Sequence, residues 1–223
     1  MKHLAYLVLF LAASLGATSC RTHNAPINSA PLLEDYPAAW THYLADPNVS
    51  RQDVWQIHDG ILICKGTPLG YLYTTQDYDD FTLRLQWRWA PGKAPGKGGV
   101  LIRMTGTHKI WPKSLEAQIN ANDAGDFWGL DGYGLSGDVD RRKTLTHETF
   151  GELTHLKKTQ GQEKSPGQWN TYEIIAQNDT VTLMINGEQV NQATHCATNP
   201  GKVCLTSEGT EIHFRNISLT RLD

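Results

Sequence analysis

A carboxylate and two amides alternate with apolar residues along positions 114–120 (SLEAQIN) of this 223-residue chain. Successive side chains of a β-strand point to opposite faces, so Glu116, Gln118 and Asn120 would share one face. A carboxylate accepts or donates a proton, and amides hydrogen-bond to hydroxyl groups. Trp128 follows closely and offers a flat apolar surface. This combination suits a sugar-binding cleft, although a polar stripe without a function would simply be a solvated outer face.

Two further side chains are candidates for such a cleft. Glu208 lies in the sequence Ser207-Glu208-Gly209, at the end of an apolar run. It is a candidate second acid or base, and its alternative role is to anchor Arg215 in an ion pair. Tyr71 lies in an aromatic run and would either line a sugar site or pack in the core.

Metal chemistry has weaker support in the sequence. His147, Glu148 and His155 lie in one polar stretch, but their spacing matches no common zinc motif. We therefore predict no metal and no other cofactor, and leave a divalent metal as an open alternative.

The elements that must position these residues are strands. Residues 81–89 (FTLRLQWRW) place five apolar side chains on one face and four polar ones on the other, which is the pattern of a half-buried strand. Asn186-Gly187 between two such runs predicts a type I′ hairpin turn. We therefore predict an all-β fold, an antiparallel two-sheet β-sandwich of the jelly-roll type. Further strands are expected at 99–104, 115–120, 171–176, 181–185, 202–206 and 212–219, and a short helix within 32–45.

One long stretch breaks this pattern. Residues 136–168 are polar, contain several glycines and show almost no alternation. Connecting loops of this length are uncommon unless they have a function, so we expect a mobile rim or lid beside the binding face.

Composition excludes some function classes. The net charge is −3, and the only basic cluster is Arg141-Arg142-Lys143, so the electrostatic footprint of a nucleic-acid-binding protein is missing. Of the four cysteines, Cys196 and Cys204 flank a predicted turn and are candidates for a disulfide, with Cys64 left as a free thiol.

The N-terminus resembles a bacterial export signal. An apolar run of about ten residues, too short to span a bilayer as a helix, is followed by small residues that end at Cys20. This arrangement resembles a lipobox, in which the cysteine is acylated. We expect a lipoprotein signal peptide at 1–19, a tether and lead-in segment at 20–45, and one jelly-roll domain at 46–223. The expected location is a membrane-anchored lipoprotein of the periplasm or outer membrane, with a soluble periplasmic or secreted protein as the alternative.

Beyond these features, the sequence resembles the 3-keto-disaccharide (3-keto-glycoside) hydrolase domain family over roughly residues 50–222. The core signature of that family is a W-P-K-S-x-E-x-Q strand followed by an A-G-D-F-W loop, and this chain has both, at 111–118 and 124–128. One departure is visible, because the family commonly reads G-N-S-G where this chain has Gly96-Lys97-Gly98-Gly99. Further matches lie at 80–83, 99–103, 167–174, 185–187, 207–209 and 214–217.

The resemblance implies a concanavalin A-like fold and cleavage of glycosides already oxidised at C3. A ketone at C3 acidifies the C2 hydrogen, so a base can remove it, the aglycone leaves C1, and water then adds. In this scheme Glu116 is the base or acid, Glu208 is the second such group, and Lys113 and Arg103 stabilise the enolate oxygen. The expected partners are the sugar substrate and a sugar 3-oxidoreductase of the same pathway. The remaining substrate-binding candidates are Arg103, Gln118, Asp126, Trp128, Tyr71 and Arg215.

Two alternatives stay open. Retaining glycanases on this type of sandwich carry an E-x-D-x-x-E strand that supplies both carboxylates, whereas positions 116–121 read EAQINA. A conventional glycanase that pairs Glu116 with Glu208 is therefore the disfavoured alternative. The other alternative is a non-catalytic, lectin-like module that binds sugars with the same aromatic and amide side chains.

Overall fold

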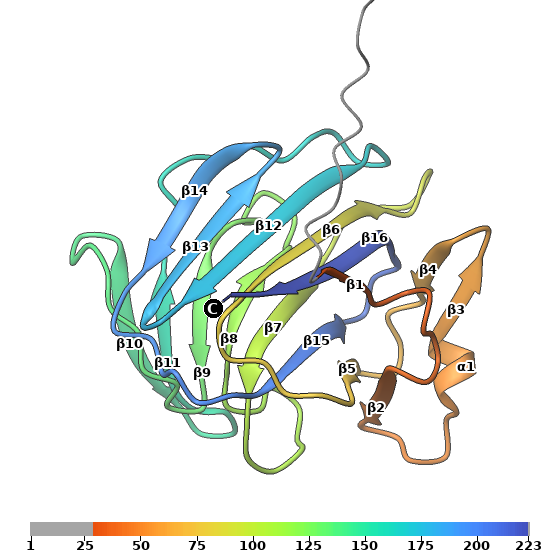
Figure 1. Cartoon of the computed structure of the whole chain (residues 1–223), viewed down its shortest axis with the longest axis horizontal. Helices are drawn as coiled ribbons and strands as arrows, with labels where there is room; N and C mark the ends of the chain where they lie inside the picture. Colours follow the sequence, from red (N-terminus) through yellow and green to blue (C-terminus); the bar gives the residue numbers. More distant parts are fainter. Residues whose placement is uncertain (1–28, 223) are drawn as a thin grey trace, which may run out of the picture.

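Two antiparallel sheets pack face to face in the computed structural model, which describes residues 29–222 (Figure 1). Within that range each sheet has eight strands. The first sheet has the order β14-β13-β12-β6-β16-β4-β3, with β1 also paired to β16; the second has the order β10-β11-β9-β8-β7-β15-β5-β2. The predicted antiparallel two-sheet sandwich is confirmed.

The strands of the first sheet are β1 (Ser29–Pro31), β3 (Trp55–His58), β4 (Ile61–Cys64), β6 (Phe81–Trp89), β12 (Asn170–Gln177), β13 (Thr180–Ile185), β14 (Glu188–Ala193) and β16 (Ile212–Arg221). Those of the second sheet are β2 (Trp40–Leu44), β5 (Gly70–Thr74), β7 (Gly99–Met104), β8 (Ser114–Gln118), β9 (Phe127–Leu130), β10 (Arg142–His147), β11 (Gly151–Leu156) and β15 (Lys202–Ser207). The single short helix in this part of the chain is α1 (Arg51–Val54). Residues 29–222 contain no helix that is long and apolar enough to span a membrane.

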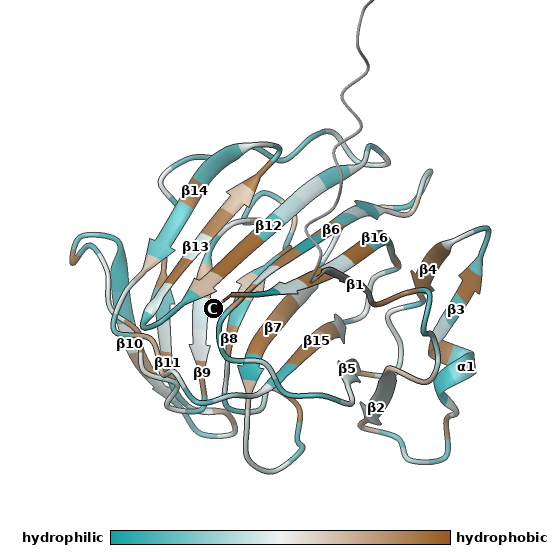
Figure 2. Ribbon diagram, in the orientation of Figure 1, coloured by the Kyte–Doolittle hydropathy of each residue, from teal (hydrophilic) through white to brown (hydrophobic). Residues whose placement is uncertain are grey.

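The main core lies between the sheets. It takes Leu83 and Leu85 from β6 and Ile174 from β12 on one side, and Val100 and Ile102 from β7 on the other. The alternation read from 81–89 is thus confirmed, because its apolar side chains are buried. Figure 2 shows the apolar residues concentrated on such central strands. The hairpin turn after β13 is also as predicted, since Asn186 and Gly187 both have positive φ angles, of 54° and 89°.

The second sheet is also apolar on the face turned away from the core. Leu101 alternates with Val100 and Ile102 along β7 and joins a second buried cluster with Met104 and Leu130. As a result, all six residues of β7 are buried. The functional site described below lies on this outer face.

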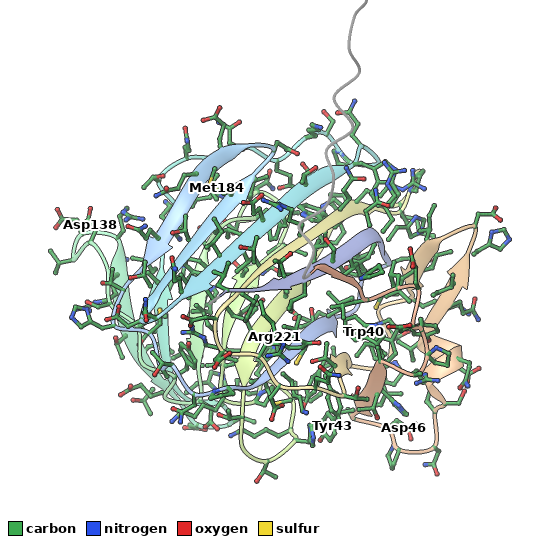
Figure 3. All side chains as sticks on the ribbon, in the orientation of Figure 1. Trp40, Tyr43, Asp46, Asp138, Met184 and Arg221 are labelled. Carbon is green, nitrogen blue, oxygen red and sulfur yellow. The ribbon has the colours of Figure 1, made fainter. Side chains whose placement is uncertain are left out.

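Several sequence-based expectations need correction. The segment 20–45 is not only a tether, because β1 and β2 lie within it and pair with β16 and β5. The helix expected within 32–45 is absent, and turns leading into β2 take its place. Trp40 and Tyr43, labelled in Figure 3, project from this strand. The expected signal peptide at 1–19 and the lipidated Cys20 lie outside the described residues.

The stretch 136–168 is also more ordered than expected. It contains a hairpin of β10 and β11, which extends the second sheet beyond β9. The alternation was hard to recognise because β10 is almost entirely exposed, so few of its residues are apolar. Asp138, in the loop before β10, lies at the outer edge of the molecule in Figure 3.

The proposed disulfide is not formed. Cys64, Cys196 and Cys204 are all buried free thiols. Cys196 packs in the core between the sheets, whereas Cys204 belongs to the cluster on the outer face of the second sheet. Because the two thiols lie on opposite sides of the sheet, the turn between them does not bring them together.

Candidate functional site

Strand register brings the predicted Glu116 and Trp128 side by side. Glu116 pairs with Trp128 on β9 and with Leu101 on β7, which in turn pairs with Cys204 on β15 and through it with Tyr73 on β5. The five residues form one row across the outer face of the second sheet. Directly paired residues of neighbouring strands have adjacent side chains, so the carboxylate lies between an indole and an aliphatic surface.

Two adjoining pockets cover this face. The first, called here the Gln118 pocket, has a volume of about 160 Å³ and the second, the Tyr71 pocket, about 180 Å³. Lys97, Trp111 and Glu208 line both, so the pockets form one continuous groove. The Gln118 pocket is completed by Glu116, Gln118, Asn120, Trp128, Leu130 and Leu153. The Tyr71 pocket is completed by Leu69, Gly70, Tyr71, Leu101, Ile110, Thr206 and Ser207.

Glu116 is buried at the base of the Gln118 pocket, with 5% of its surface exposed. No hydrogen bond to its carboxylate is formed within residues 29–222. Burial raises the pKa of Glu116 well above its usual value, and the nearby charge of Glu208 raises it further. A carboxyl group of this kind holds its proton at a higher pH than an exposed one, which is the adjustment that general acid–base catalysis requires.

Glu208 follows β15 and stands where the two pockets meet. Its Oε1 is buried and has no hydrogen-bond partner in the described part of the chain. Burial raises the pKa of Glu208, and the Thr206 hydroxyl, the Lys97 charge and the Trp111 indole oppose that rise. Two carboxyl groups that share a low-dielectric pocket do not both ionise readily, so the pair retains a proton.

Trp128 forms one wall of the Gln118 pocket and is held from behind. Its ring stacks on His155 of β11, with ring centroids 4.3 Å apart and planes at 15°. His155 Nε2 lies 2.6 Å from Asp126 Oδ2, and the other oxygen of Asp126 accepts a hydrogen bond from Lys158 N at 2.9 Å. The indole Nε1 of Trp128 is buried and has no hydrogen-bond partner among the described residues.

Trp111 forms part of the wall at the junction of the two pockets. It belongs to the loop between β7 and β8 and has a φ angle of 57°. Its ring meets Phe150, from the turn between β10 and β11, edge to face with centroids 4.1 Å apart. The hairpin within 136–168 therefore borders the groove, through Phe150 behind Trp111 and through Leu153 in the lining.

At the far end of the groove, the lining residue Tyr71 belongs to a cluster of aromatic rings. The Tyr71 hydroxyl is hydrogen-bonded to His108 Nδ1 at 2.9 Å. Tyr43 stacks on Tyr71 at 5.4 Å, and Tyr73 lies 4.6 Å from the His108 ring. The predicted lining role of Tyr71 agrees with this placement.

Three predicted site residues lie elsewhere. Arg103, whose side chain is completely buried, is bound to Asp80 at 3.0 Å and to backbone carbonyl groups, so it stabilises the fold. Lys113 is exposed beside a separate surface pocket. Arg215 lies on the first sheet, where it stacks on Trp169 at 4.1 Å. The roles in enolate stabilisation and substrate binding therefore do not fit these residues.

Asp126 also needs a correction. It is 3% exposed, does not line the groove, and uses both carboxylate oxygens for His155 and Lys158. Its position supports Trp128 through His155 and leaves no oxygen for a sugar. The other metal-ligand candidates, His147 and Glu148, lie at the exposed end of the β10–β11 hairpin. No group of three His, Cys, Asp or Glu side chains within residues 29–222 is arranged to hold a metal ion.

Sequence reasoning gave no role to Lys97, which is the cation that lines both pockets. The signal was present, because Lys97 lies within Gly96-Lys97-Gly98-Gly99, where the chain departs from the family pattern. Gly99 itself makes room for the acid, since a Cβ at this position would lie 2.3 Å from Glu116 Oε1.

Solved structures with this fold confirm the concanavalin-like jelly roll. A candidate glycosyl hydrolase from Parabacteroides distasonis is 19% identical, with a TM-score of 0.61 over 87% of this chain and 99% of that one. The β-glucanase of Bacillus licheniformis is 13% identical, with a TM-score of 0.56 over 87% and 97%. The carbohydrate-binding module CBM66 of Bacillus subtilis is 12% identical, with a TM-score of 0.58 over 82% and 95%. No curated protein sequence matches the chain.

These similarities define the fold class, a concanavalin-like jelly roll, and the family is defined by a separate sequence comparison. The model of the 3-keto-alpha-glucoside-1,2-lyase-like domain matches residues 34–220. The chain belongs to this family.

Proposed function

We propose that this protein cleaves the glycosidic bond of 3-keto-glycosides by elimination followed by addition of water. The observation that carries the proposal is a pair of carboxyl groups in one groove, the buried Glu116 and the partly buried Glu208. Such a pair provides a base and an acid.

The roles of the two acids follow from where they lie. Glu116 lines only the Gln118 pocket, where free amide groups suit a sugar ring. In the reactive state the proton that the pair retains lies on Glu208, and Glu116 is ionised and removes the C2 proton; its raised pKa makes this carboxylate a stronger base. The electron pair of the C2–H bond passes through the enolate of the C3 ketone, forms a C1–C2 double bond and expels the aglycone from C1. Glu208, at the junction of the pockets, gives its proton to the departing oxygen. Water then adds its hydroxyl to C1 and a proton returns to C2, which yields the free 3-keto sugar.

The groove also offers stabilisation for the negative charge that develops on the C3 oxygen. Lys97 is the cation in its lining. Preorganised donors in a water-poor site stabilise an enolate more strongly than water does.

Direct hydrolysis is a poorer fit to the same groove. Counted from Glu116, the E-x-D-x-x-E pattern of a retaining glycanase would place further carboxylates at positions 118 and 121, which hold Gln118 and Ala121. Neutral amides do not provide a nucleophile for C1, whereas they hydrogen-bond well to sugar hydroxyl groups.

The experiment compares methyl 3-keto-α-glucoside with its unoxidised parent, in heavy water and with an enzyme-free control. We expect rapid release of methanol from the keto compound only, with deuterium introduced at C2. Comparable cleavage of the parent would favour the conventional glycanase. Binding of either sugar without cleavage would favour a lectin-like module.

The surroundings of the reaction are part of the proposal. A 3-keto-glycoside arises by oxidation of the C3 hydroxyl, so a sugar 3-oxidoreductase must supply the substrate. We place the protein outside the cytoplasm on a lipid anchor at Cys20, on the strength of the small residues that precede this cysteine.

A further inference from the structure

We infer that the Tyr71 pocket is an aglycone subsite built for an apolar, ring-sized leaving group rather than for a second sugar. The inference rests on the proposed function and names the class of substrate that this function serves. It depends on three features of the groove: its continuity, the state of its polar groups and its size.

The aglycone is placed in the Tyr71 pocket because this pocket is continuous with the Gln118 pocket. Glu208 and Trp111 line both halves of the groove, whereas Glu116 lines only the Gln118 pocket. With the C2 hydrogen of the sugar at Glu116 and the glycosidic oxygen at Glu208, the group on the far side of that oxygen extends into the Tyr71 pocket.

The hydroxyl groups of the Tyr71 pocket already have protein partners. Tyr71 is bound to His108 at 2.9 Å, and Ser207 donates to the carbonyl of Pro68 at 2.8 Å. Thr206 accepts from the amide of Gly99 at 2.7 Å and donates to its carbonyl at 3.2 Å. Leu69, Leu101 and Ile110 add an aliphatic surface, and the charged groups in the lining, Lys97 and Glu208, are the two that the Tyr71 pocket shares with the Gln118 pocket. A sugar bound here would bury hydroxyl groups without adequate partners, which is costly.

In the Gln118 pocket, by contrast, the amide side chains have few or no hydrogen-bond partners in the part of the chain that the structure describes. The Gln118 side chain forms no hydrogen bond within residues 29–222. Asn120 uses its oxygen to accept from Gly98 N at 3.0 Å, and its amide N–H groups stay free in the same part of the chain. Trp128 Nε1 is buried without a partner. Apart from Lys97 and Glu208, which line both pockets, the groups with free hydrogen-bonding capacity are therefore the amides of the Gln118 pocket.

The size of the Tyr71 pocket matches one ring. Its volume is about 180 Å³, and an apolar cavity of roughly 150 Å³ is known to hold a benzene molecule. Burial of such a ring against Leu69, Ile110 and the Trp111 face contributes to transition-state binding in proportion to the area removed from water.

The test compares 3-keto-glucosides with methyl, cyclohexyl and glucosyl aglycones. Methoxide and cyclohexoxide are leaving groups of similar basicity, so their difference reports on the pocket rather than on chemistry. We expect kcat/KM for the cyclohexyl compound to exceed that for the methyl and glucosyl compounds by about tenfold or more.

A matched pair of variants assigns the preference to the pocket. Leu69 is 44% exposed and lines it, while Leu145, on β10, is 43% exposed and lines neither pocket. Leu69→Asn should lower the cyclohexyl-to-methyl ratio of kcat/KM, and Leu145→Asn should leave the ratio unchanged. Cleavage of all three compounds with equal kcat/KM would overturn the subsite and leave the proposed function standing. Failure to cleave any of them would overturn both.

Discussion

Gly99 leaves the space that the Glu116 side chain occupies, so a side chain added at position 99 would overlap this acid. A Cβ there would lie 2.3 Å from Glu116 Oε1 and 2.8 Å from its Cγ. The atoms in the way belong to the end of a flexible side chain, so the acid would move while the strands stay in place.

Gly99→Ala should therefore displace Glu116 and lower kcat/KM for a 3-keto-glycoside by about tenfold or more, because misplacement of a reacting group by about 1 Å is costly. The cost in stability should stay within the ~1–3 kcal/mol typical of overpacking. The matched control is Gly161→Ala, since a Cβ at Gly161 meets nothing within 4 Å. Steady-state kinetics and urea unfolding measure both effects, and a Gly99→Ala protein with unchanged kcat/KM would refute the assignment.

The lysine that lines the groove is not the lysine that the sequence predicted to stabilise the enolate. Lys97 lines both pockets, whereas Lys113 is exposed beside a different one. Lys97→Met should lower kcat by about 10²-fold, the usual effect of losing one donor to a developing oxyanion. Lys113→Met should change kcat by less than about twofold. Equal losses in the two variants would show that Lys97 has no special role.

Coupling between the two acids is measurable directly. Because the charge of Glu208 raises the pKa of Glu116, Glu208→Gln should lower the pKa of Glu116. A carbon-13 NMR titration of labelled glutamate side chains reports this shift. Glu211→Gln is the control, since Glu211 is bound to Lys93 and His213 and lies outside the groove. If both variants left the Glu116 titration unchanged, the two carboxyl groups would not share a proton.

The proposed anchor has a simple test. If Cys20 is acylated, Cys20→Ala should move the protein from the membrane fraction to a soluble fraction, because a single lipidated residue would carry the attachment. The measurement is fractionation followed by immunoblotting, with Cys196→Ala as a control for loss of a thiol. Unchanged membrane association of the Cys20→Ala protein would remove the lipid anchor from the proposal.

Because a half-buried strand must alternate, local alternation was enough to predict seven of the sixteen strands in residues 29–222, namely β6, β7, β8, β12, β13, β15 and β16. It placed β7 at Gly99–Met104, as the structure does, and it put Glu116 and Gln118 on one face. It failed for β10, where exposure on both faces removes the apolar signal. Alternation of apolar and polar residues therefore predicts strands that are buried on one face, and it does not predict strands that are exposed on both faces.

The composition of the site was only partly predictable. Glu208 and Tyr71 were named from their types, and both line the groove. Arg103 and Lys113 were named because cations suit an enolate, yet the positive φ angle of Arg103, 48°, and its pairing with Asp80 direct it away from the groove. The partner of a charged side chain depends on contacts between residues distant in sequence, such as position 80 with position 103, and alternation carries no information about these.

Glu116→Gln is the central test of the mechanism, because it keeps the shape of the side chain and removes the proton-transfer group. Activity on a 3-keto-glycoside should fall by about 10²–10⁴-fold. A variant as active as the wild type would exclude Glu116 from proton transfer.

The same substitution should change stability in a pH-dependent way. The pKa of Glu116 is higher in the folded state than in the unfolded chain. Above about pH 4.3, the usual value for glutamate, the unfolded state therefore releases its proton first, and the free energy of unfolding of the wild type falls as the pH rises towards the folded-state pKa. Gln does not titrate, so Glu116→Gln should become progressively more stable than the wild type over that range. Urea unfolding at a series of pH values measures the difference, with the exposed Glu188→Gln as the control for loss of one charge. A constant difference between Glu116→Gln and the wild type at every pH would contradict a buried, proton-holding Glu116.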